Sequence, residues 1–153
     1  MPTSRRSRTI ATAPERVWEV IADPHHLPRW WPDVKRMESV EPDRWTEVLT
    51  TRKGRPVRMD FELVSSEPPG AGGDPPGRRV FKQEIDGTPF ERVLGEAITE
   101  IVLEPAVAGT RVTIALSQKL RGYSRTGGFL LRRATRAKLD EALHELERIL
   151  TPR

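Results

Sequence analysis

The sequence contains no cysteine and few of the other residues that mark common reaction chemistries. Without cysteine, disulfides, thiolate metal sites and cysteine nucleophiles are excluded. Histidine occurs only at His25, His26 and His144, and no His-x-x-x-His pattern is present. A Gly-x-Ser-x-Gly motif is also missing, so a serine-hydrolase triad has no support. We therefore expect neither a metal site nor a cofactor.

Long hydrophobic runs are missing as well. No segment approaches the roughly 18 consecutive apolar residues of a membrane helix. The arginine-rich start, Met1 to Arg8, does not lead into an apolar stretch of signal-peptide length. Mean hydropathy is low at −0.56. These features predict a cytoplasmic protein without a membrane span.

The length and charge of the chain limit its organisation. Its 153 residues are the size of one domain, and no repeat or linker divides them. We predict a single domain over residues 1–153, with frayed ends at 1–4 and 151–153. The formal net charge of +4 favours solubility and suggests an anionic partner only weakly.

The first third of the chain predicts one strand and two short helices. Residues 3–12 alternate loosely, as in a strand. Pro14 suits the first turn of a helix, and apolar residues follow it at helical spacing. Asp23 and Pro24 end this helix and can start a second one, which runs to about Trp31.

The middle of the chain changes to the period of two that is typical of strands. After the first strand, about six more are expected, near 34–41, 44–51, 57–63, 78–85, 93–103 and 112–116. From Val93 to Leu103, alternate residues form one face. The segment from Pro68 to Gly77 holds four prolines and four glycines, which predicts a mobile hairpin loop over 68–77.

From about residue 125 the period returns to 3.6 and predicts a long amphipathic helix that ends near Leu150. Its apolar face comprises Leu131, Thr135, Leu139, Ala142, Leu146 and Ile149. Consecutive strands with short turns predict an antiparallel sheet, so the fold class is α+β and the last helix buries its apolar face on the sheet. A curved sheet around one helix seldom fills the space between them, and such a gap is where a small ligand binds.

Three segments carry a resemblance to a known family. They are Ile10-Ala-Thr-Ala-Pro-Glu-Arg-Val-Trp, Ala22-Asp-Pro, and Leu27-Pro-Arg-Trp-Trp-Pro, and the turn at Gly109-Thr-Arg-Val fits as well. Together with the element order, they resemble the START-like helix-grip (SRPBCC) superfamily, and within it the polyketide cyclase/dehydrase-like branch. The resemblance covers roughly residues 5 to 150.

This resemblance implies a seven-stranded curved antiparallel sheet that grips a long C-terminal helix, with two short helices after the first strand and an internal hydrophobic cavity. Members of the superfamily bind lipids, quinones, plant hormones or polyketides, and some are cyclases or aromatases. A fold with so many activities does not select one. Our first hypothesis is therefore binding of a hydrophobic, lipid-, quinone- or polyketide-like small molecule in the cavity.

Residues on the expected inner faces are the candidate ligand-binding residues. The apolar candidates are Trp31, Met59, Phe61, Phe81, Phe90, Leu116 and Leu131. The polar candidates are Gln83, Thr99, Gln118, Arg132 and Thr135. A few polar groups in an apolar lining would orient a ligand. The alternatives are strand-edge positions for the polar strand residues, a hydroxyl bonded back to its own helix for Thr135, and a snorkelling surface position for Arg132.

Two further hypotheses concern function. A cyclase or aromatase would hold a flexible chain in a reactive shape, with one acid–base group assisting. The sequence offers only His25 or His26 for this group, and the alternative for both is an ordinary surface histidine.

The consecutive residues Trp30 and Trp31 cannot both face one side of a regular element. One can pack in the core while the other borders the cavity; alternatively, both have only a structural packing role.

The third hypothesis is an interaction protein that uses the basic outer face of the last helix. No acidic residue lies between Glu104 and Asp140, while Arg133 and Arg136 lie on the polar face of that helix. A solvated surface is the simpler interpretation. Aromatic residues do not interleave with the basic ones as they do in a base-stacking surface, so we do not expect a nucleic-acid partner. The protein is expected to be a monomer or a homodimer.

Overall fold

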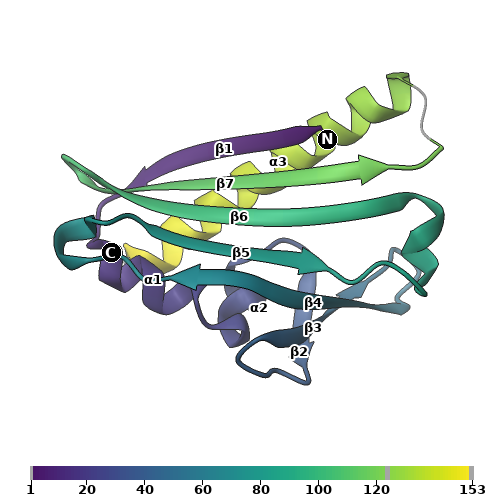
Figure 1. Cartoon of the computed structure of the whole chain (residues 1–153), viewed down its shortest axis with the longest axis horizontal. Helices are drawn as coiled ribbons and strands as arrows, with labels where there is room; N and C mark the ends of the chain where they lie inside the picture. Colours follow the sequence, from purple (N-terminus) through teal and green to yellow (C-terminus); the bar gives the residue numbers. More distant parts are fainter. Residues whose placement is uncertain (1, 123–124, 152–153) are drawn as a thin grey trace.

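The computed structural model describes residues 2–122 and 125–151, in which one long helix crosses one face of a seven-stranded antiparallel sheet (Figure 1). The sheet order is β1-β7-β6-β5-β4-β3-β2. The strands are β1 (Thr3–Ile10), β2 (Val34–Glu38), β3 (Arg44–Thr50), β4 (Pro56–Glu67), β5 (Gly77–Gln83), β6 (Leu94–Ala106) and β7 (Gly109–Leu120). The helices are α1 (Pro14–Ile21), α2 (Leu27–Trp30) and α3 (Arg125–Leu150), with short 3₁₀ helices η1 (Pro24–His26), η2 (Ala71–Gly73) and η3 (Pro89–Arg92). The predicted α+β class and the helix-grip arrangement are confirmed.

The two edge strands of the sheet, β1 and β2, are consecutive in the sequence. The segment formed by α1, η1 and α2 joins them, and β1 pairs with β7, the last strand of the chain. Pro14 opens α1, while Val17 and Ile21 are buried. The Asp23 side chain caps η1 by accepting a hydrogen bond from the backbone N–H of His25 at 3.0 Å. In this segment α1 contacts β6 and β7, and α2 contacts β2 and α3.

The helix α3 packs through the apolar face that its periodicity predicts. Leu139, Ala142 and Leu146 are fully buried and belong to the same core as Ile10 and Ile114. Thr135 is buried too, and the two end positions of the predicted face, Leu131 and Ile149, are half-buried. In Figure 1, α3 runs diagonally behind β1, β7 and β6, and its N-terminal end projects past the strands. No helix within the described ranges is both long and apolar enough to cross a bilayer.

The turn between β6 and β7 explains the Gly109-Thr110 pair. Gly109 has φ +140°, and a Cβ there would lie 2.1 Å from the carbonyl oxygen of Ile10. Only glycine fits such a close backbone approach. The buried Thr110 hydroxyl then donates to the carbonyl oxygen of Thr12 at 2.8 Å. The pair thus joins the start of β7 to the end of β1.

A register shift in β6 breaks the alternation that the sequence predicts there. The irregularity lies between Leu94 and Glu96, opposite the end of β7. From Ala97 to Leu103 the predicted inner face is buried, whereas Val93 is 38% exposed. A bulge of this kind moves the preceding residues out of phase with the rest of the strand.

The segment over 68–77 forms the connection between β4 and β5. It contains η2, and the backbone N–H of Gly70 donates to the carbonyl oxygen of Pro75 at 2.9 Å. Its predicted mobility remains a prediction. At the start of the chain, β1 begins at Thr3, inside the segment 1–4 that was expected to fray.

Candidate functional site

A cavity of about 120 Å³, partly open to solvent, lies between the inner face of the sheet and α3. Five strands, α3 and the residue after α2 contribute to it. Its lining comprises Trp31, Glu47, Leu49, Met59, Phe61, Phe81, Gln83, Ala97, Thr99, Leu116, Gln118 and Lys138. The volume is below the roughly 300–1,000 Å³ of pockets for drug-sized ligands. It is close to the roughly 150 Å³ of apolar cavities that take up benzene.

The strand register brings the lining residues together. Phe61 lies opposite Gln83, and Thr99 lies between Phe81 on β5 and Leu116 on β7. Eight of the twelve residues predicted from the sequence line the cavity. They are Trp31, Met59, Phe61, Phe81, Gln83, Thr99, Leu116 and Gln118.

The other four predicted residues do not line this cavity. Phe90 is half-buried in η3, in the connection between β5 and β6, so it lies outside the strand alternation. Leu131 and Arg132 are half-buried on the N-terminal half of α3, about two turns before Lys138, the helix residue that reaches the cavity. Thr135 is buried among the core residues instead.

The tandem tryptophans divide between core and cavity, which is one of the two alternatives left open by the sequence. Trp30 is 2% exposed and belongs to the core, while Trp31 lines the cavity. Their rings meet edge to face, with centroids 5.4 Å apart. This arrangement is expected for consecutive residues at the end of a short helix.

Three aromatic rings form a wall beside the cavity, and two of them, Phe61 and Phe81, line it. Trp45 stacks on Phe61 with ring centroids 6.1 Å apart, and Phe81 meets both rings edge to face. The wall joins β3, β4 and β5. Such pairs add about 0.5–1.5 kcal/mol each beyond the burial of their surface.

Glu47 is one of two charged lining residues, with Lys138, that sequence reasoning missed. The residue is 4% exposed and lines the cavity, and its Oε2 accepts a hydrogen bond from Trp45 Nε1 at 3.2 Å. Burial raises the pKa of Glu47 to about 7, although the Trp45 hydrogen bond and the charge of Lys138 act to lower it. Near neutral pH this carboxyl is therefore partly protonated and can either donate or accept a proton.

A signal for Glu47 does exist in the sequence. Trp45 and Glu47 are two residues apart on one strand, so they share a face, and an inward Trp45 requires an inward Glu47. The direction of Trp45 could not be decided from β3 alone. Lys138 was missed because the apolar stripe that predicted the inner face of α3 does not include it. Its Nζ lies 3.9 Å from Asp33 Oδ2.

Gln83 carries an unused hydrogen-bond donor. It is 7% exposed at the end of β5, and its Nε2 is buried with no partner among the residues the structure describes. A buried donor without a partner costs about 1–3 kcal/mol. Gln118 and Thr99 add two more polar groups to the lining. The cavity thus combines an apolar wall with a few polar groups, as ligand-binding sites do.

The match to a protein-family model agrees with the fold and the cavity described above. Residues 1–151 match the family model described as polyketide cyclase / dehydrase and lipid transport. The chain belongs to this family.

The names of the proteins similar to this polyketide cyclase/dehydrase family member range from uncharacterized protein to ARO/CYC. The uncharacterized protein Rv2574 of Mycobacterium tuberculosis is 27% identical over 148 residues, covering 94% of this chain and 81% of its own. The crystal structure of TTHA0849 from Thermus thermophilus is 23% identical, with a TM-score of 0.67 and 97% of each chain covered. StfQ, a di-domain aromatase/cyclase (ARO/CYC) of the steffimycin biosynthetic pathway, is 16% identical with a TM-score of 0.72, covering 95% of this chain and 49% of its own. At these identities the solved structures show a shared fold.

This family member also buries an arginine near the aromatic wall. Arg79 is 4% exposed, its guanidinium lies 5.5 Å from the Trp45 ring centroid, and its Nη1 donates to Ser66 Oγ at 3.1 Å. Burial lowers the pKa of the Arg79 guanidinium, while the charge of Asp23 acts to raise it. A buried arginine stays charged, so it holds the face of Trp45 by a cation–π contact.

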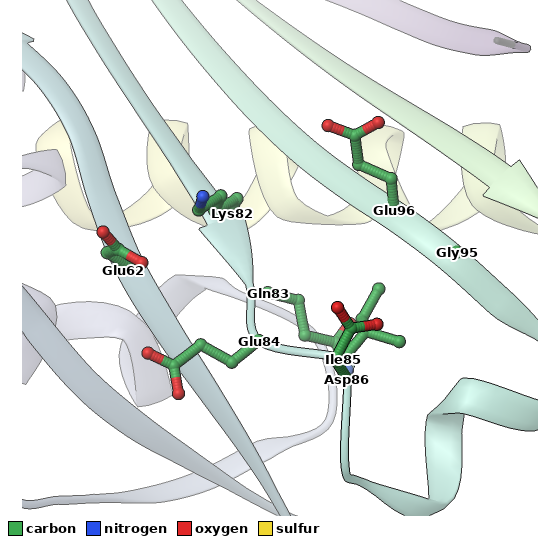
Figure 2. Close-up of a pocket in the computed structure, with 8 residues that line it drawn as sticks. All are labelled: Glu62, Lys82, Gln83, Glu84, Ile85, Asp86, Gly95 and Glu96. Atoms are coloured by element: carbon green, nitrogen blue, oxygen red, sulfur yellow. The ribbon is translucent and has the colours of Figure 1, made fainter.

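A larger hollow of about 410 Å³ lies at the end of β5, shares the lining residue Gln83 with the cavity and is open to solvent (Figure 2). Four carboxylates border it, those of Glu62, Glu84, Asp86 and Glu96. In Figure 2 they spread around the hollow and do not converge. Within residues 2–122 and 125–151, no group of three potential ligands is placed to hold a metal ion. The polar lining and open shape make this hollow a poorer candidate for an apolar ligand than the cavity between the sheet and α3.

The histidines and the basic helix face lie away from the cavity. The His25 side chain is 67% exposed, with Nδ1 2.9 Å from Asp23 Oδ1. Arg133 is exposed and Arg136 half-buried, and both border a surface hollow on α3 together with Phe129. A partner for this basic face remains a prediction, as do the oligomeric state and the cytoplasmic location.

Proposed function

We propose that this protein binds a hydrophobic small molecule in the cavity between the sheet and α3. The observation that carries the proposal is an apolar cavity whose few polar groups have hydrogen-bonding capacity to spare. Burial of apolar ligand surface supplies about 25 cal/mol per Å². The volume of about 120 Å³ favours a single-ring compound, the size of a simple quinone or phenol, over a long lipid chain. The family description supports the same role.

A cavity-filling substitution tests this proposal. Ala97 is 6% exposed and lines the cavity, so Ala97→Phe is expected to fill it and weaken binding of toluene at least tenfold. Binding is followed by amide chemical-shift changes in an NMR titration. Val64→Phe, at a side chain 56% exposed, is the matched control and keeps wild-type binding. Saturable binding of toluene that is equal in both variants would reject the cavity as the site.

A second candidate function is a cyclase-type enzyme in which Glu47 is the acid–base group. Two observations favour it: the pKa of about 7 of this cavity carboxyl, and the structural likeness to an aromatase/cyclase. A general base or acid works best when its pKa lies near the working pH. The aromatic wall would hold the reacting chain in place, which lowers the entropic part of the barrier.

The enzyme candidate predicts turnover of a reactive poly-β-ketone. Glu47→Gln keeps the size and polarity of the side chain but cannot transfer a proton, so cyclised product is expected to form about 100-fold more slowly. Glu41→Gln, at an exposed position, is the control. Product formation at equal rates in wild type and Glu47→Gln would show that Glu47 is not the acid–base group. If the wild type forms no product, the enzyme candidate is rejected and ligand binding is the one proposed function that remains.

A further inference from the structure

We propose that Gln83 and Glu47 form a polar subsite that selects an uncharged single-ring compound bearing a carbonyl oxygen. This inference rests on the proposed ligand-binding function and names the chemical class of the ligand. The two residues come from different strands, β5 and β3, and both line the same cavity. The aromatic pair Phe61 and Phe81 lies in the same lining and supplies an apolar surface for the ring.

The Gln83 amide gives the subsite its preference for an acceptor. Its Nε2 is buried and has no partner among the described residues, in a side chain that is 7% exposed. A carbonyl oxygen in the cavity would accept this N–H and remove the cost of the unpaired donor. A hydrocarbon of the same shape would leave the donor unpaired, so the site discriminates between the two.

Glu47 gives the subsite its preference for a neutral molecule. One carboxyl oxygen accepts from Trp45, which leaves the other available to the cavity. While protonated, the carboxyl can donate a second hydrogen bond to a ligand oxygen. Once ionised, it can only accept, and it repels an anionic ligand at short range.

The charged groups around Glu47 do not reverse this preference. Lys138 reaches the cavity from α3, but its Nζ also faces Asp33 Oδ2 from the connection after α2. Arg79 on β5 lies against the Trp45 ring and is not among the lining residues. The nearest cation at the cavity is thus shared between two carboxyl groups, which leaves little positive charge for a carboxylate ligand.

Three single-ring probes test the inference by NMR titration of the whole chain. Acetophenone carries the carbonyl, α-methylstyrene replaces its oxygen with CH₂, and benzoate carries a charge. At pH 6 we expect acetophenone to bind about tenfold more tightly than α-methylstyrene. The side-chain NH₂ signals of Gln83 should shift with acetophenone and much less with α-methylstyrene. Benzoate should bind more weakly than acetophenone at pH 8, where Glu47 is mostly ionised.

Two variants separate the contributions of the subsite. Gln83→Leu is expected to remove the preference for acetophenone while α-methylstyrene still binds. Lys82→Leu, the neighbouring exposed position on β5, is the matched control and keeps the preference. The wild type should lose affinity for acetophenone between pH 6 and pH 8, and Glu47→Gln should not, because a glutamine keeps a donor at every pH.

Equal binding of acetophenone and α-methylstyrene by the wild type would overturn the inference and leave the proposed function standing. Tighter binding of benzoate than of acetophenone would also overturn it, by assigning the cavity to anions through Lys138. If Gln83→Leu still prefers acetophenone to α-methylstyrene, Gln83 Nε2 is not the donor that recognises the carbonyl oxygen. If neither neutral compound binds saturably, the proposed function fails together with the inference.

Discussion

At pH 8 the variant Glu47→Gln is expected to be more stable than the wild type by up to about 3 kcal/mol. The reason is the burial of an ionisable carboxyl whose pKa in the folded protein is raised to about 7 from its ordinary value of 4.5. A raised pKa means that the folded state holds its proton more tightly than the unfolded state does. Below about pH 4.5 Glu47 is protonated in both states and does not destabilise the folded protein. The folded protein loses stability as the pH rises, and above about pH 7 it carries the full destabilisation by the buried, ionised carboxyl.

Urea unfolding of wild type and Glu47→Gln between pH 4 and pH 8 measures the effect. The two proteins should have similar free energies of unfolding near pH 4 and diverge steadily up to about pH 7. Glu41→Gln, at an exposed position, should follow the wild-type curve throughout. If Glu47→Gln loses stability in parallel with the wild type over this range, the carboxyl is not a source of the pH dependence.

Leu146→Ala is expected to lower the free energy of unfolding by about 3–4 kcal/mol. Leu146 is fully buried on the side of α3 that meets the sheet, and truncation of such a leucine leaves a cavity that the core cannot close. For a chain of this size the melting temperature should fall by on the order of 10 °C. Leu146 does not line the ligand cavity, so the variant should still bind toluene below its melting temperature.

Leu130→Ala on the same helix is the control for Leu146→Ala. Leu130 is 57% exposed, so its truncation should change the free energy of unfolding by less than about 0.5 kcal/mol. Calorimetry of both variants compares the two faces of α3 directly. Equal shifts in melting temperature would contradict the docking of this helix through Leu146.

Local periodicity predicted most of the strands and the last helix, whereas the seven-stranded sheet gripping that helix was implied by the family resemblance. The 3.6-residue period of α3 identified Leu139, Ala142 and Leu146, and the structure buries all three. Alternation along β4 likewise placed Phe61 inside, and the candidate Phe81 on β5 is buried in the same lining. A strand face is visible from a few neighbouring residues, so most of the apolar lining was accessible to sequence reasoning.

The chemistry of the cavity was not accessible in the same way. The burial of Glu47 depends on rings from β4 and β5 and on α3, which are distant in the sequence. Strand phase was a second difficulty for prediction, because the register shift between Leu94 and Glu96 interrupts an alternation of inward and outward side chains that looked continuous in the sequence. The sequence therefore predicted the uncharged polar residues Gln83, Thr99 and Gln118, whereas the charged residues Glu47 and Lys138 emerged only from tertiary packing. The Trp45-x-Glu47 spacing contained a hint of the first of these two.

The pairing of the first strand with the last one has a consequence for how the chain assembles. Thr3 meets Ser117 across 114 positions of sequence, so β1 has no strand to join until nearly the whole sheet has been synthesised. Contacts of such long range close slowly because the intervening chain must be ordered first. During translation the hairpins from β2 to β7 can form in succession, and attachment of β1 completes the sheet edge last.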